Sequence, residues 1–187
     1  MSQLDVLFIE PNSSGEAYQE LSHSYSAIET PTWALLLAQS CRSKGYGVGI
    51  LDCVAERLTI GESVSKIRTI NPKLVVFVMY GQNPNSGTVN MIGACKLGKL
   101  LKESYPEYPI CMVGTHVSAL PKEVLNYPFV DFVLLNEGVY ALHNLLKTNL
   151  IEQYPGVVSM DKVNEWIFQP GLPSDAPNPT SDAFDKV

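Results

Sequence analysis

The 187-residue sequence lacks the features that would place it in a membrane, in the secretory pathway or on nucleic acid. No apolar run approaches the roughly 20 residues that a membrane-spanning helix needs. The N-terminal stretch MSQLDVLFIE has no basic region followed by a small-residue cleavage site, so we expect no secretory signal. The net charge is −6, and Lys and Arg are scattered, which argues against a phosphate backbone as partner.

Cysteine and histidine are too few and too far apart to predict a metal centre. The four cysteines, Cys41, Cys53, Cys95 and Cys111, form no CxxC pair and no CxxxCxxC cluster, so neither a zinc site nor an iron–sulfur cluster is supported. The three histidines show no metal-ligand spacing either. We expect four reduced thiols in a cytoplasmic protein.

Motifs for nucleotide binding and catalysis are also missing. No GxGxxG follows the first apolar run, no GxxxxGK[ST] occurs, and no Ser–His–Asp or paired-carboxylate arrangement stands out. The residues alone therefore indicate a binding domain.

What the sequence does contain is a regular alternation of predicted strands and helices. Short apolar runs predict strands at residues 4–9, 48–52, 74–79, 110–113 and 130–135. Helical periodicity predicts helices at residues 32–44, 60–70, 87–104, 121–126 and 139–148. Such alternation predicts a parallel sheet covered on both faces, here a flavodoxin-like (Rossmann-like) doubly wound α/β fold with strand order 2-1-3-4-5.

This pattern predicts one domain over residues 1–150. Residues 151–187 are expected to form a small hairpin, with residues 157–159 pairing with 165–168, followed by a linker rich in Pro, Ser and Asp.

Polar loops follow four of the predicted strands, at residues 10–15, 80–86, 114–118 and 136–138. Ligands of doubly wound sheets bind outside the carboxyl ends of the strands, so these loops predict a site at one edge of the sheet. The first connection, residues 10–32, is long for a compact domain, which also favours a function.

Each of these loops also has a purely structural interpretation. Ser86 or Thr88 would cap the next helix, and Ser118 would cap the helix that begins near Pro121. His116 is as often a structural residue as a ligand contact. Gly114 would allow a ligand to lie against a strand end. Glu137 beside a helix N-terminus disfavours a phosphate and favours a neutral, amide-rich ligand.

The order of the segments TPTWALLLA, GYGVGILD, NPKLVVFVMYGQNP, ICMVGTHVSALPKEVL and VDFVLLNEGVYALHNLL resembles the N-terminal cobalamin-binding domain of cobalamin-dependent radical SAM enzymes. The resemblance covers about residues 4–148. The family's GGxHxSALP is represented by VGTHVSALP, and its GEGE by NEGV, so each motif keeps one glycine and loses another. The cofactor-binding residues that the resemblance implies are Asn12, Ser13, Ser14, Thr30, Tyr80, Gly81, Gln82, Asn83, Gly114, Thr115, His116, Val117, Ser118, Asn136, Glu137 and Gly138.

The resemblance also implies how the cobalt would be coordinated. Other cobalamin carriers use a DxHxxG loop whose histidine ligates cobalt, whereas the loop here has Asn12 at the histidine offset. We therefore expect no histidine ligand, with Asn12 near the lower face of the corrin or leaving it to water. Such weak coordination should ease methyl transfer.

The catalytic half of such an enzyme, with its S-adenosylmethionine and [4Fe–4S] cluster, has no counterpart in this sequence. We expect that this chain does not catalyse a reaction alone and that a radical SAM domain acts with it in cis or in trans. The two alternatives are a domain for a flavin or sugar nucleotide, which should have more phosphate-binding glycines than Gly15 after the first strand, and a non-catalytic interaction module.

Overall fold

The computed structural model describes residues 3–13, 15, 28–81, 84–147 and 167–168. The elements are β1 (Val6–Glu10), α3 (Thr32–Ser43), β2 (Val48–Asp52), α4 (Ile60–Ile70), β3 (Leu74–Met79), α5 (Pro84–Ser104), β4 (Ile110–Gly114), α6 (Thr115–Ala119), α7 (Pro121–Leu125), β5 (Phe132–Leu134), α8 (Val139–Lys147) and β6 (Ile167–Phe168). The strands pair in the order β2-β1-β3-β4-β5-β6, and every pairing is parallel. The predicted flavodoxin-like order is confirmed for the first five strands.

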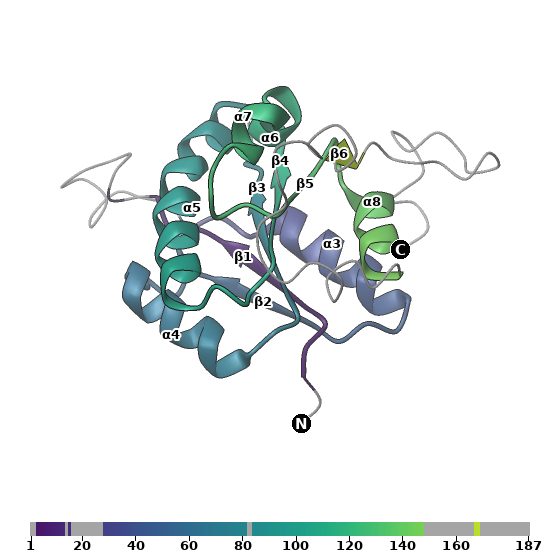
Figure 1. The fold of residues 1–187 in the computed structure, drawn as a ribbon, viewed down its shortest axis with the longest axis horizontal. Coiled ribbons are helices and arrows are strands. Elements are labelled where there is room, and N and C mark those ends of the chain that lie inside the picture. The colour runs from purple at the N-terminus through teal and green to yellow at the C-terminus, as the bar shows by residue number, and fades with distance from the viewer. Residues whose placement is uncertain (1–2, 14, 16–27, 82–83, 148–166, 169–187) are drawn as a thin grey trace.

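Two apolar layers cover the sheet, one on each face. Figure 1 shows α4 and α5 on one face and α3 and α8 on the other, and the two clusters of core residues divide in the same way. The side chains of β1 alternate between the layers, with Leu7 in one and Phe8 in the other. All residues of β3 are fully buried, because this continuous apolar strand lies in the middle of the sheet with helices on both sides.

Three local features differ from the sequence-based prediction. Ile167–Phe168 forms a sixth strand that pairs in parallel with β5, which was not expected; the predicted hairpin stays a prediction, because its other strand at 157–159 lies outside the described residues. The short helix α6 was not expected. Helix α5 begins at Pro84, so Ser86 and Thr88 lie inside it and do not cap it. The predicted domain boundary at residue 150 stays a prediction.

All four cysteines are free thiols, and three of them are buried. Burial raises the pKa of Cys41 to about 12 and that of Cys53 to about 11, so both stay neutral at physiological pH. In the described part of the chain, no helix is long and apolar enough to cross a bilayer.

The ends of β3 and β4 approach each other so closely that only glycine fits at Gly114. This residue is paired with Met79 and has a φ of +155°. A Cβ atom there would lie 2.3 Å from the Met79 carbonyl oxygen. The glycine is therefore required by the sheet itself, whether or not a ligand lies against it.

We expect Gly114→Ala to lower the free energy of unfolding by about 2–4 kcal/mol, from backbone strain and the clash with Met79. Urea unfolding followed by circular dichroism measures the change. Gly61→Ala is the control: Gly61 is exposed on α4 with nothing within 4 Å of the added Cβ. That variant should gain about 0.4–1 kcal/mol. Equal stability of the Gly114 variant and the wild type would contradict the required close approach.

Candidate functional site

The chain leaves β1 and β3 toward opposite faces of the sheet, which creates a topological switch point between these two neighbouring strands. After β1 the chain continues to α3, and after β3 it continues to α5 on the other face. Doubly wound folds bind their ligands at such a point. We use "switch point" for Glu10–Ser13, Tyr80, Gly81 and Asn90, which gather there.

The loop after β1 is held against α5 by Ser13. This side chain is only 3% exposed; its hydroxyl donates to the Asn90 carbonyl at 3.2 Å and accepts the Gly93 N–H at 2.9 Å. A Cβ atom on Gly93 would lie 2.5 Å from the Asn12 carbonyl oxygen, so loop and helix touch directly. Ser13 therefore positions the loop and its neighbour Asn12.

Asn90 of α5 connects the two strands of the switch point, and the sequence-based prediction missed it. Its side-chain amide donates to the Glu10 carboxyl oxygen Oε1 and to the Tyr80 carbonyl, both at 3.3 Å. Burial first, and then the negative charges of Asp52 and Glu29, raise the pKa of Glu10 to about 8. The polar groups that meet here are thus an amide, a carbonyl and a carboxyl group with a raised pKa.

Tyr80 also ties the switch point to the end of β5. Its ring stacks on Trp33 of α3, with centroids 4.6 Å apart, and its hydroxyl donates to the Asn136 carbonyl. Burial raises the pKa of the Tyr80 phenol, and the charge of Glu137 adds to this effect. Asn136 is exposed and has a φ of +53°, a conformation that asparagine tolerates better than most residues.

Ser118 joins the loop after β4 to the loop after β5. Its hydroxyl donates to the Gly114 carbonyl at 2.9 Å and accepts the Asn136 N–H at 2.8 Å. Ser118 lies within α6, and α7 begins after Leu120 without a side-chain cap, so the interpretation of Ser118 as the cap of that helix is wrong.

The remaining residues of the β4 loop face other parts of the protein. The His116 ring nitrogen Nδ1 lies 3.2 Å from the Thr88 hydroxyl of α5. A Cβ on Gly87 would lie 2.2 Å from the Thr115 hydroxyl oxygen, so Thr115 also packs on α5. Val117 is fully buried, and its side chain belongs to the core.

The other predicted site residues are placed as follows. Gly138 is buried, has a φ of +71° and immediately precedes α8. Glu137 is half-buried beside it, and Thr30 is exposed ahead of α3, where its carbonyl accepts the Thr32 N–H. Ser14, Gln82 and Asn83 lie outside the described residues.

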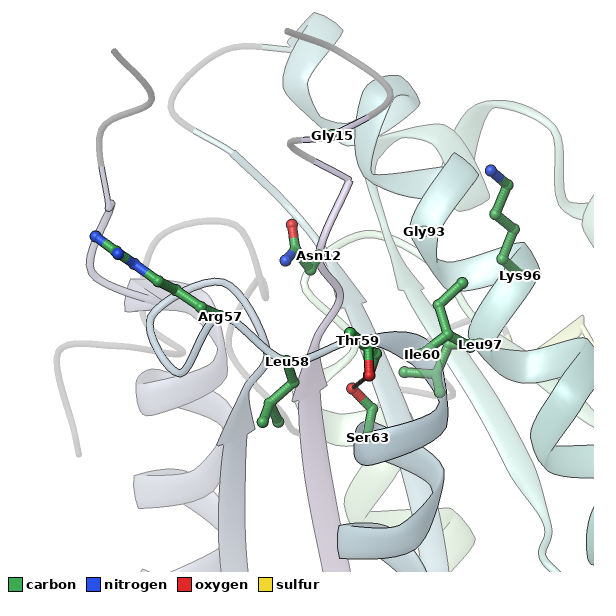
Figure 2. A pocket seen from close by; sticks show the side chains of 10 residues that line it. All are labelled: Asn12, Gly15, Arg57, Leu58, Thr59, Ile60, Ser63, Gly93, Lys96 and Leu97. Carbon is green, nitrogen blue, oxygen red and sulfur yellow. Dashed lines mark hydrogen bonds between the residues drawn. The ribbon is translucent and has the colours of Figure 1, made fainter. Parts of the chain in front are cut away.

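A small cavity of about 270 Å³ adjoins the loop after β1. Figure 2 shows Asn12 and Gly15 of this loop beside the start of α4 and the flank of α5, with Arg57 and Lys96 on opposite sides of Asn12. The volume is below the roughly 300–1,000 Å³ of sites for drug-sized ligands, so this cavity alone does not accommodate a large cofactor. Asn12 is the predicted cofactor contact that borders it.

In the part of the chain that the structure describes, no cluster of three or more His, Cys, Asp or Glu side chains has the geometry of a metal site.

A protein-family model described as "B12 binding domain" matches residues 21–146, more than half of the chain. The match begins after β1 and therefore does not include Asn12 or Ser13. No curated protein matches the sequence.

Replacing Ser13 by alanine should lower the free energy of unfolding by about 1–3 kcal/mol, because it removes the two hydrogen bonds that hold the loop after β1 against α5. Urea unfolding measures this cost, and hydrogen exchange should show faster exchange at the Gly93 amide. Ser65→Ala is the matched control, since Ser65 is exposed on α4 and bonds only the Gly61 carbonyl. We expect that control to stay within about 0.5 kcal/mol of the wild type. A Ser13 variant as stable as the control would show that this bond does not hold the loop.

Proposed function

The chain belongs to the B12-binding domain family, and on this premise we propose that it binds cobalamin at the switch point, over the carboxyl edge of the sheet and without a histidine ligand to cobalt. The observation that carries the proposal is the convergence of four strand ends, β1, β3, β4 and β5, with their polar loops at one edge. Hydrogen bonds of Asn90, Tyr80 and Ser118 connect these loops into one surface.

The chemistry of the switch point fits a neutral ligand rich in amides. The corrin ring of cobalamin carries acetamide and propionamide groups, which both donate and accept hydrogen bonds. Asn90, the Tyr80 carbonyl and the protonated Glu10 offer both kinds of partner. The charges that act on Glu10 from the described residues are negative, which disfavours the phosphates of a flavin or sugar nucleotide at this point.

Residues from each loop would hold the cofactor. From the described part of the chain these are Asn12, Thr30, Tyr80, Gly81, the segment 114–118 and the segment 136–138, and Ser14, Gln82 and Asn83 are proposed with them. Ser13 would act by fixing Asn12, since its own hydroxyl is buried against α5. Val117 would contribute its backbone, since its side chain belongs to the core.

When bound, cobalamin supplies a cobalt centre that carries a methyl group. The residues of this chain bind and orient the corrin and shield one of its faces, and they do not by themselves provide a catalytic group. A radical SAM domain, in cis or in trans, would bring S-adenosylmethionine and a [4Fe–4S] cluster for methyl transfer or related radical chemistry. The resemblance of the ordered motifs to such enzymes supports this partner, and the buried neutral thiols suit a reducing compartment such as the cytoplasm.

Purified protein incubated with hydroxocobalamin and then desalted should retain about one equivalent of cobalamin, with a perturbed visible spectrum. Flavin mononucleotide, treated in the same way, should not be retained and serves as the control for the alternative ligand class. A colourless protein that is folded by circular dichroism would contradict the proposal.

Asn12→His tests where the first loop lies relative to the corrin. We expect the spectrum of the bound cobalamin to shift, because an imidazole at this position would coordinate the cobalt from below. Asn126→His makes the same change at the end of α7 and should leave the spectrum as in the wild type. Identical spectra for both variants would remove Asn12 from the lower face without affecting the evidence for cobalamin binding.

A further inference from the structure

Glu10 is the last residue of β1 and lies at the switch point. It is half-buried and is paired in register with Asp52 at the end of β2. Of the groups around it, Asn90 on α5 and Tyr80 on β3 are uncharged. Among the residues that the structure describes, the charged groups that act on it are Asp52 and Glu29, and both are acidic. An ionised Glu10 would therefore be a partly desolvated anion among like charges.

Asp52 bonds to the backbone of the turn that follows its own strand. Its oxygen Oδ1 accepts the backbone N–H groups of Val54 at 3.0 Å and Ala55 at 2.9 Å, which holds the turn after β2. The Asp52 side chain is thus engaged by its own turn, whereas burial raises the pKa of the neighbouring Glu10 carboxyl group to about 8, with Asp52 and Glu29 contributing in the same direction.

The hydrogen bond from Asn90 occupies one of the two oxygens of the Glu10 carboxyl group. Asn90 donates to Oε1 of Glu10 and to the Tyr80 carbonyl, so Oε1 is used as an acceptor. A protonated carboxyl group has one O–H donor, which leaves Oε2 to carry the proton. Glu10 ends β1 at the carboxyl edge, which is where ligands of doubly wound sheets bind.

We propose that Glu10 is a specificity-determining residue that donates a hydrogen bond from its protonated carboxyl group to an amide carbonyl of the ligand. This inference rests on the proposed cobalamin site, and it adds a recognition residue to that site. The O–H donor would bind a carbonyl oxygen of the ligand, whereas Asp52 and Glu29 would repel a negatively charged ligand group. Loss of the Glu10 proton removes the donor and places a negative charge against the carbonyl oxygen.

Binding of methylcobalamin at pH 7 and pH 9 tests the inference, because the methyl ligand does not titrate in this range. With a pKa of about 8, the protonated fraction of Glu10 falls from about 0.9 to about 0.1, so the Kd of the wild type should rise about tenfold. The Tyr80 phenol, whose pKa is raised, stays protonated throughout.

Three variants isolate the role of the proton. Glu10→Gln has an amide N–H donor at both pH values, so its Kd should change by less than about twofold between them. Glu10→Ala lacks the donor and should bind about five- to tenfold more weakly than the wild type at pH 7, with no pH response. Glu56→Gln removes an exposed carboxylate that pairs with Lys66 and should keep the tenfold response of the wild type.

Proton uptake gives a second test that needs no variant. Calorimetric titrations at pH 8.5 in buffers of different ionisation enthalpy should show that the wild type takes up at least about half a proton per cobalamin. Equal Kd values of the wild type at pH 7 and pH 9, absence of proton uptake, or a tenfold response retained in Glu10→Gln would each overturn the inference while cobalamin binding stands. A wild type that binds at neither pH would instead contradict the proposed function on which the inference rests.

Discussion

Much of this molecule depends on one constraint of chain topology: β1 lies between β2 and β3 in the sheet. The connection from β1 to β2 crosses one face of the sheet, and the connection from β3 to β4 crosses the other face. With both neighbours paired in parallel, the loops after β1 and β3 must part at the carboxyl edge. Polar groups such as Glu10 and Asn90 lie in the space between these loops, outside the apolar core. The placement of the site therefore follows from the order of the strands.

Several polar and glycine residues at this edge serve the protein itself. Gly114 permits β4 to approach Met79, and Ser118 joins two loops. The departures from the resembling motifs also have a physical account. Asn136, in the position of a motif glycine, keeps a left-handed backbone with a φ of +53°, and Val113, in the position of another, is fully buried against Gly138. At each position the residue present therefore fits its place in this fold, Asn136 in a left-handed turn and Val113 in the buried strand β4.

The order of the first five strands and the edge at which the polar loops gather were predictable, because apolar runs such as residues 74–79 indicate buried strands directly. Asn90 was not predictable, since an amide in the middle of a long helix carries no signal in the sequence and acquires its role only when β1 and β3 lie beside it. The raised pKa of Glu10 depends on its burial and then on Asp52, which is distant in sequence and adjacent in the sheet, so neither cause could be inferred from the sequence. The two-residue strand β6 is too short to show a periodicity.

The central claim is that cobalamin lies over the carboxyl edge at the switch point, and mapping the amide shifts of the ¹⁵N-labelled protein on addition of methylcobalamin tests it most directly. The account predicts shift changes concentrated at residues 10–13, 80–81, 114–118 and 136–138, with residues at the amino ends of the strands, such as Val6 and Leu74, unaffected. Shift changes that concentrate at the amino ends, or on the outer surfaces of α4 and α8, would contradict it.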